Sequence, residues 1–422
     1  MSGKAPHGEK RAERATWTPH TTGSVSRADW AHLPAPAWNV FDTALQSREH
    51  ALLACVCRSW REGTRSFKPR VNLRSCTRAQ IRAFCKSFAW RSRASTMQLL
   101  RMPPNFGLSA AYAAMLTKEC PNLLTLDATI VLKAPVCVVN AARVAARVAP
   151  LNLKFVHVSA GNALKSDNGR KLLAAASSLD MQTTDEMDYF FETGALRAVA
   201  VALEAPGCRI KSLDVSVRGE AYEIGARCLA RALSRNSSLR RLNLSNCCHD
   251  DTQIVPLLHA VSANTALTHL DLSATTLNGV GAIVAFMLFQ NSTLRVLDLN
   301  FSFPSSDDCM LICEAIEFNT GLVNLEFCSC LDQYENEHSF GDASAEVLAK
   351  SLATNASLRH LAIRDNGITD VGAAKLAQAL VGNTTLLQLD ARDNVNITRH
   401  GAQLLRAAVP RMLVDIPRNR GW

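Results

Sequence analysis

The sequence lacks the features of membrane and secreted proteins. Its 422 residues contain no run of about 18 apolar residues, so no segment is expected to span a bilayer. Residues 1–24 have no apolar core typical of a secretory signal, and Glu9 and Glu13 are unusual in a mitochondrial presequence. We therefore expect residues 1–29 to form a flexible polar leader, and we expect the protein in the cytoplasm or the nucleus.

Signatures of catalysis and metal binding are missing as well. There is no P-loop, no H-E-x-x-H, no G-x-S-x-G and no dinucleotide fingerprint, and no histidine pairs recognisably with a nucleophile. The 14 cysteines include no C-x-x-C pair, which argues against a zinc site, and without a secretory signal reduced thiols are expected. We expect a protein that is not an enzyme and that holds no metal and no cofactor.

Outside the first third of the chain, positive and negative residues are nearly equal in number. Residues 1–121 hold 19 Lys/Arg against 7 Asp/Glu, whereas the remaining residues carry 27 against 30. A nucleic-acid-binding protein more typically shows a basic stripe along its main binding surface. We interpret these charges as solvated surface and do not expect nucleic acid to be the partner.

What the sequence does contain is a repeat. The pattern L-x-x-L-x-L-x-x-N occurs at Leu358, Leu361, Ile363 and Asn366, and it returns 28 residues later with Asn394 at its last position. Searching backwards gives about twelve units, each with one residue at this last position, which we call the ladder position. The ladder positions are Cys76, Asn105, Val131, Gly161, Thr184, Arg218, Cys247, Thr275, Ser302, Cys330, Asn366 and Asn394.

The pattern predicts a short strand followed by a helix in each unit. Alternate strand residues point to opposite sides, so Leu242 and Leu244 are expected in the core and Asn243 on the other side. A single unit cannot bury its apolar face alone, and the units therefore stack into a solenoid. Residues 67–410 resemble the ribonuclease-inhibitor type of leucine-rich repeat, an α/β fold with a curved parallel sheet inside and helices outside. Residues 411–422 are expected to add a last short strand and a polar cap.

Two groups of polar residues accompany the repeat. A small polar or thiol side chain at the ladder position is expected to turn inward and bond to the backbone, which makes the cysteines there structural. Asparagine also recurs at the end of the predicted helix in six units, where we expect it to close the helix in the left-handed conformation rather than to accept a glycan. These asparagines are Asn236, Asn264, Asn291, Asn319, Asn355 and Asn383.

The register places one column of residues along the middle of the predicted concave face. Seven of its twelve members are acidic, so the column either attracts a basic partner or simply solvates the strands. The column is Asn72, Arg101, Asp127, His157, Asp180, Asp214, Asn243, Asp271, Asp298, Glu326, Ala362 and Asp390. The expected partner-binding residues are its members Asp127, Asp214, Asp271, Asp298, Glu326 and Asp390, with Arg364 and Arg392 from the next column.

Two units are longer than the others. The additions at residues 331–342 and 183–194 are predicted to be loops, which serve either recognition or no function.

The segment before the repeats has a motif of its own. Residues 30–66 are predicted to form two short amphipathic helices: Leu33-Pro34 can open the first, and Trp60 ends the apolar face of the second. With the order Leu-Pro, hydrophobic helix, valine, Arg-Ser-Trp, this segment resembles an F-box. His50 and Pro36 depart from the family pattern, which usually has a leucine and an acidic residue there.

An F-box directly before leucine-rich repeats resembles the F-box/leucine-rich-repeat substrate receptors. The resemblance implies a non-enzymatic receptor whose F-box holds the Skp-type adaptor and cullin of a ubiquitin ligase, while the concave face holds an unidentified protein target. The implied adaptor-binding residues are Leu33, Pro34, Phe41, Leu45, Leu53, Val56 and Trp60. The alternatives are a Ran-type GTPase-activating protein, and a scaffold or inhibitor in which the two helices only cap the repeats.

Overall fold

A computed structural model describes most of the repeat region. The described residues are 70–77, 79–81, 85, 94, 97–103, 106–155, 163–181, 193–215, 222–246, 251–302, 304–330, 340–408 and 413–415. The chain divides into two units, Met1–Ser66 and Phe67–Trp422, and every described residue belongs to the second unit. The predicted leader, the F-box-like segment and most of both predicted loops lie outside the described residues.

Short parallel strands recur along the second unit and form two sheets, with orders β1-β2-β4 and β15-β14-β13-β12-β11-β10-β9-β8-β7-β6-β5-β3. The strands are β1 (Arg70–Asn72), β2 (Leu99–Arg101), β3 (Phe106–Gly107), β4 (Thr125–Asp127), β5 (Thr129–Leu132), β6 (Leu151–Phe155), β7 (Ala176–Asp180), β8 (Ser212–Asp214), β9 (Arg241–Asn243), β10 (His269–Asp271), β11 (Val296–Asp298), β12 (Asn324–Glu326), β13 (His360–Ala362), β14 (Gln388–Asp390) and β15 (Leu413–Asp415). The last of these lies where the sequence predicts a final strand.

From β3 onward helices alternate with the strands, except that β5 follows β4 directly. They are α6 (Ala110–Glu119), α7 (Pro135–Ala145), the short 3-10 helix η3 (Ala163–Lys165), α9 (Asp167–Ala175), α10 (Thr193–Glu204), α11 (Tyr222–Leu233), α12 (Asp251–Ala263), α13 (Gly281–Gln290), α14 (Ser306–Ala315), α15 (Gly341–Thr354), α16 (Asp370–Leu380) and α17 (Arg399–Ala408). None of the described helices combines the length and the apolar character that a membrane crossing requires.

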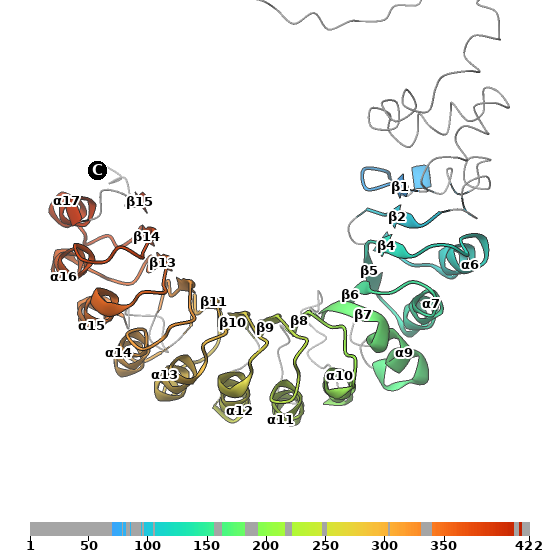
Figure 1. Ribbon diagram of the computed structural model, residues 1–422, viewed down its shortest axis with the longest axis horizontal. Coiled ribbons are helices and arrows are strands. Elements are labelled where there is room, and N and C mark those ends of the chain that lie inside the picture. Colours follow the sequence, from blue (N-terminus) through green and yellow to red (C-terminus); the bar gives the residue numbers. More distant parts are fainter. Residues whose placement is uncertain are drawn as a thin grey trace, which may run out of the picture. The chain divides into compact units, whose positions relative to one another are not determined.

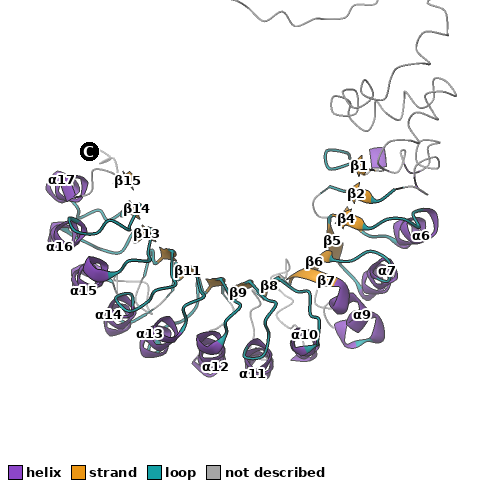
Figure 2. Ribbon diagram, in the orientation of Figure 1, coloured by secondary structure: helices purple, strands orange, loops and turns teal. Residues whose placement is uncertain are grey.

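The strands line the inner side of the second unit, and the helices form its outer side (Figures 1 and 2). Leu242 and Leu244 are both buried, as the strand pattern predicts. In α16, Ala373, Leu376 and Leu380 are buried at helical spacing and pack toward the sheet. The predicted α/β solenoid of leucine-rich repeats is therefore confirmed.

The ladder position has the inward orientation that the pattern predicts. Thr275, Ser302, Asn366 and Asn394 are fully buried. The Ser302 hydroxyl donates to the Leu299 carbonyl at 2.6 Å, and Asn366 Nδ2 donates to the Phe327 carbonyl of the preceding unit at 2.6 Å. These side chains satisfy backbone groups at the end of each strand, which a purely apolar core would leave unpaired.

The asparagines at the helix ends do not have the predicted conformation. Asn291 has φ of −93°, outside the left-handed region, and its side chain is buried between units. Its Nδ2 donates to the carbonyls of Val261 and Asn264, at 2.8 and 2.9 Å. Its Oδ1 accepts from the backbone N–H groups of Thr293 and Leu294. The predicted left-handed cap is therefore wrong. The role of this asparagine is to join two successive units through its side-chain amide.

The left-handed conformation occurs elsewhere in the unit, at the residue that precedes the ladder position. Ala274, Phe301, Asp365 and Asp393 have φ between 52° and 64°. The strand is therefore followed by a tight turn that aims the ladder side chain inward.

The sheet also departs from the predicted column near its amino-terminal end. Strand β4 pairs with β2, whereas β5, which follows it directly, pairs with β3 and β6. In β6, Leu153 is paired with Leu179, so Lys154 lies beside Asp180 at the position predicted for His157. His157 itself lies outside the described residues. The predicted register is wrong here because Val156 and Val158 flank His157 with the apolar alternation of a strand. His157 lies three residues after Lys154, which occupies this position in the structure.

Candidate protein-interaction site

Most of the predicted concave residues lie side by side on consecutive strands. The register pairs Asp271 with Asp298, Asp298 with Glu326, Glu326 with Ala362, and Ala362 with Asp390. The same line of paired positions continues back through β9 and β8 to β7. We call this line the central row; its members are Asp180, Asp214, Asn243, Asp271, Asp298, Glu326, Ala362 and Asp390.

The middle of the central row is acidic. Asp271 accepts hydrogen bonds from the Ser273 backbone and hydroxyl, and Asp298 accepts one from the Asn300 backbone N–H at 2.9 Å. Glu326 Oε2 accepts from Asn300 Nδ2 at 2.8 Å. Within the described ranges, no ion pair is formed by any of these three carboxylates. Three carboxylates on adjacent strands therefore face the inner side, and none of them is ion-paired with a described residue.

The crowding of these carboxylates has an electrostatic consequence. The pKa of Asp298 is raised from 3.8 to about 6, mainly by burial and also by the neighbouring charges of Asp271 and Glu326, which together outweigh the lowering effect of the Asn300 N–H. The folded chain therefore holds this carboxylate in an environment that is unfavourable for its charge.

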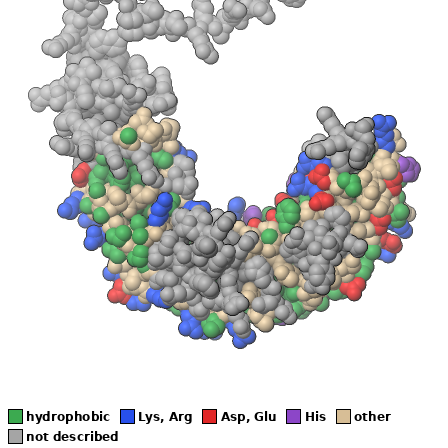
Figure 3. Space-filling model, turned by 180° about the vertical axis from the view of Figure 1, so that it is seen from behind, with side chains coloured by type: hydrophobic (Ala, Val, Ile, Leu, Met, Phe, Trp, Pro, Cys, Tyr) green, Lys and Arg blue, Asp and Glu red, His purple; other side chains and the backbone are tan. Residues whose placement is uncertain are grey.

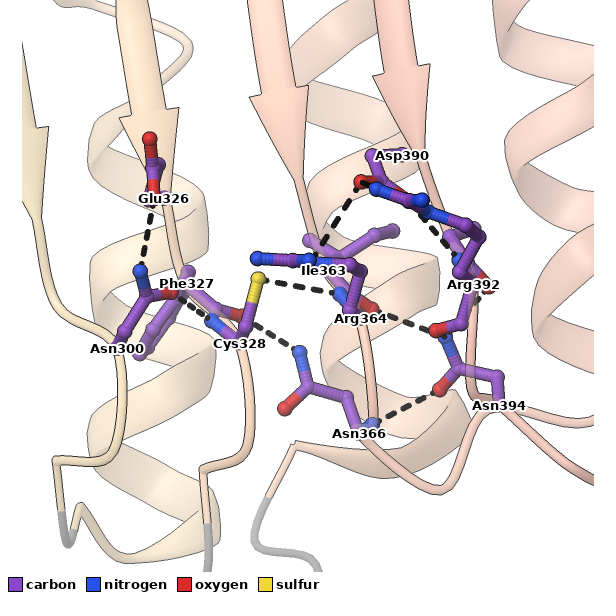
Figure 4. Close-up of polar contacts among 11 residues, drawn as sticks. Asn300, Glu326, Phe327, Cys328, Ile363, Arg364, Asn366, Asp390, Arg392 and Asn394 are labelled. Atoms are coloured by element: carbon purple, nitrogen blue, oxygen red, sulfur yellow. Dashed lines mark hydrogen bonds and ion pairs between the residues drawn. The ribbon is translucent and has the colours of Figure 1, made fainter. Parts of the chain in front are cut away.

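The carboxyl-terminal end of the row has the opposite character. Asp390 accepts from Arg392 Nε at 2.9 Å and from Nη2 at 2.6 Å, and its Oδ2 lies 3.5 Å from Arg364 Nε (Figure 4). Burial raises the pKa of Asp390, but the hydrogen bonds and charge of Arg392, with the charge of Arg364, outweigh it, so the pKa lies below its ordinary value. Two guanidinium groups therefore lie around one carboxylate at this end of the row.

A shallow pocket of about 240 Å³ opens at this end, and Glu326, Arg364, Asp390 and Arg392 all contribute to its lining. In Figure 3, basic and acidic side chains lie close together on the inner side of the carboxyl-terminal repeats. The backbone of Arg364 is held at this place because its N–H donates to Cys328 Sγ at 3.3 Å. The two predicted arginines and Asp390 are thus brought together in one place.

Asp127 is not part of this arrangement. It lies on β4 in the three-stranded sheet, where it forms ion pairs with Arg74 at 3.0 Å and with Arg101 at 3.2 Å. Similarly, Asp180 forms an ion pair with Lys154 at 2.8 Å. The acidic character of the column is therefore neutralised toward its amino-terminal end. Arg74 was not among the predicted binding residues, although it lies two residues after Asn72, as Arg364 and Arg392 lie two residues after Ala362 and Asp390.

The buried cysteines contribute to the core rather than to a site. Cys309, Cys313 and Cys330 are each at most 1% exposed, and burial raises the pKa of each thiol. Among the described residues, no three His, Cys, Asp or Glu side chains are grouped so that they could hold a metal ion.

Comparison with protein families finds the repeat in one part of the chain, and several solved structures are similar at low identity. A family model described as "Leucine Rich repeat" matches residues 354–377. The Rad7 and Elc1 complex of yeast is similar over 74% of this chain and 74% of that chain, at 12% identity and a TM-score of 0.46. The leiomodin-1 actin-binding site 2 covers 36% of this chain and 86% of its own, at 15% identity and a TM-score of 0.30. The tropomodulin C-terminal domain of Caenorhabditis elegans covers 37% and 92%, at 15% identity and 0.32.

The chain is thus a leucine-rich-repeat scaffold. Its inner strands present a row of side chains with two charge regions: an acidic one on β10, β11 and β12, and a basic one near β13 and β14.

Proposed function

We propose that this protein is a non-enzymatic substrate receptor of a Skp–cullin–F-box ubiquitin ligase. The observation that carries the proposal is the F-box-like motif at residues 33–60, placed a few residues before the first strand of the repeat array, β1. In this reading residues 30–66 hold the Skp-type adaptor, and the array holds the protein to be ubiquitylated.

The adaptor contact would rest on a few apolar anchors. Leu53, Val56 and Trp60 follow one another at three- and four-residue spacing, which places them on one face of a helix. Large aromatic anchors contribute a disproportionate share of the binding free energy at protein interfaces. The remaining proposed contacts are Leu33, Pro34, Phe41 and Leu45.

The central row is proposed as the surface for the target. Asp271, Asp298 and Glu326 attract a basic segment, and Arg364 with Arg392 accept an acidic group further along the same segment. A target with basic residues followed by an acidic residue would match both regions. Its binding should weaken as ionic strength rises, because salt screens these charges.

A pull-down with purified Skp-type adaptor tests the first half of the proposal. Leu53→Ala combined with Trp60→Ala should weaken capture of the adaptor by about 30-fold or more, since losing an aromatic anchor typically costs ~2–4 kcal/mol. Trp17→Ala, a matched tryptophan variant in the predicted leader, should capture it like the wild type. Equal capture by all three proteins would mean that the segment does not bind the adaptor.

Affinity purification followed by mass spectrometry distinguishes the proposal from its alternatives. A receptor brings down adaptor and cullin, and the Leu53/Trp60 double variant loses both while keeping the target. A small GTPase without these subunits would indicate a Ran-type GTPase activator. A partner protein without any of them would indicate a scaffold or inhibitor.

A further inference from the structure

A second apolar surface lies on the outer side of the array, away from the central row. Helices α14 and α15 enclose an open groove of about 520 Å³. Its apolar lining comes from Met310 and Leu311 on α14 and from Val347 on α15, and Leu311 is 39% exposed. Outer helices of a solenoid need bury only the face toward the sheet, so a hollow with apolar side chains on the outside requires another explanation.

Carboxylates predominate among the charged side chains at the border of this groove. Asp307, Glu314 and Glu317 contribute carboxylates, and the one cation in the lining, Lys350, is bound to Glu346 at 3.1 Å. In the part of the chain that the structure describes, none of the three carboxylates forms an ion pair. The groove therefore combines an apolar floor with unneutralised negative charge at its border.

Two exposed aromatic side chains lie close to one another between α13 and the turn that follows α14. Phe318 follows Glu317 directly and is 55% exposed, and its ring packs edge-on against Phe289 of α13, with centroids 6.1 Å apart. Phe289 is itself 60% exposed. Because exposed aromatic side chains of α13 and of the turn after α14 gather here, the region has the composition of a protein interface rather than of ordinary surface.

We propose that the groove between α14 and α15 binds an amphipathic helix of another protein, with apolar side chains on one face and Lys or Arg beside them. Apolar anchors one turn apart fit the floor formed by Met310, Leu311 and Val347, as in other helix-in-groove complexes. The partner's cations neutralise Asp307, Glu314 and Glu317. An anionic membrane is disfavoured by the same carboxylates, and so is a second copy that presents the same face.

The probe is a labelled peptide of about 16 residues, four helical turns, with leucines at i, i+3 and i+7 and lysines beside them. A second peptide keeps the leucines and replaces each lysine by glutamate. Binding to the full chain is measured by fluorescence anisotropy at low and high salt. We expect the lysine peptide to bind at least about tenfold more tightly than the glutamate peptide, and to weaken as salt rises.

Variants of the chain locate the binding. Leu311→Asp should weaken binding of the lysine peptide by about tenfold or more, whereas Val201→Asp, at an exposed apolar position on the outer helix α10, should leave it unchanged. Glu314→Lys with Glu317→Lys should remove the preference for lysine over glutamate. Unaltered circular dichroism shows that each variant is folded.

Three results would overturn the proposal: equal binding of both peptides, equal effects of the substitutions at Leu311 and Val201, or no binding at all. Sedimentation that shows a dimer dissociated by Leu311→Asp would assign the groove to a second copy instead. Binding of the chain to phosphatidylserine vesicles that is lost in the same variant would assign it to a membrane. None of these measurements depends on the adaptor or on the central row.

Discussion

Replacing Asp298 by asparagine should make the protein more stable at neutral pH. The carboxylate lies on β11 between Asp271 and Glu326, half-buried, and forms no ion pair within the described residues. Asparagine has nearly the same shape and keeps an oxygen that can accept from the Asn300 N–H, at 2.9 Å in the native protein. The substitution therefore removes a charge and little else.

The direction and size follow from the pKa of Asp298. Burial first, then the neighbouring carboxylates, raise it from 3.8 to about 6, so the folded chain binds this proton more tightly than the unfolded chain. Asp298 therefore favours the folded state while it is protonated, and this contribution to stability is lost as the pH rises from about 4 through about 6. A shift of about two pKa units corresponds to ~3 kcal/mol. Because solvent screens a half-buried group, we expect about 1–2 kcal/mol.

Urea unfolding of the wild type and the variant at a series of pH values measures this difference. The variant should exceed the wild type by about 1–2 kcal/mol near pH 7.5, and the two should converge below about pH 4, where Asp298 is protonated in both states. Asp127→Asn is the matched control: it removes a carboxylate that is paired with Arg74 and Arg101, so it should not stabilise the protein. Equal stability of wild type and Asp298→Asn near pH 7.5 would refute the reasoning.

Three further predictions concern the packing between units and the basic end of the row. Asn291→Ala removes two hydrogen bonds to the preceding unit and two to the backbone of its own turn, and it should lower the free energy of unfolding by about 3 kcal/mol in urea, while Ser292→Ala beside it should change it little. Phe340→Ala should cost about 3–5 kcal/mol in the same assay, because that buried ring packs edge-on against Phe327 with centroids 5.4 Å apart. Arg392→Met should raise the pKa of Asp390, detectable by NMR titration of its carboxyl carbon, and an unchanged value would mean that Arg364 alone holds it down.

The sequence predicts the array well because each repeat states the same local rule. Leu242 and Leu244 show the period of a strand. In later units, the ladder residues Thr275 and Ser302 each follow the last leucine of their strand pattern at the same distance. Such patterns depend on contacts within one unit or with an identical neighbour. The alternation of the strands also determines that Asp271, Asp298 and Glu326 share one face.

What the sequence does not predict depends on contacts between distant residues. The asparagine at position 291 has the composition of a local helix cap, and only the carbonyl of Val261 in the preceding unit shows its role. The register of β6, which places Lys154 beside Asp180, is set by its pairing with β7. Likewise, the acidic border of the groove between α14 and α15 becomes recognisable only once two helices from different repeats lie side by side.

The most direct test of the proposed receptor is a calorimetric titration of the full chain with purified Skp-type adaptor. The account predicts one adaptor bound per chain for the wild type and at least about a 30-fold weaker association when Leu53 and Trp60 are both alanine. A folded wild-type chain that releases no heat with the adaptor would contradict it, and the array would then be a protein-binding scaffold without a ligase.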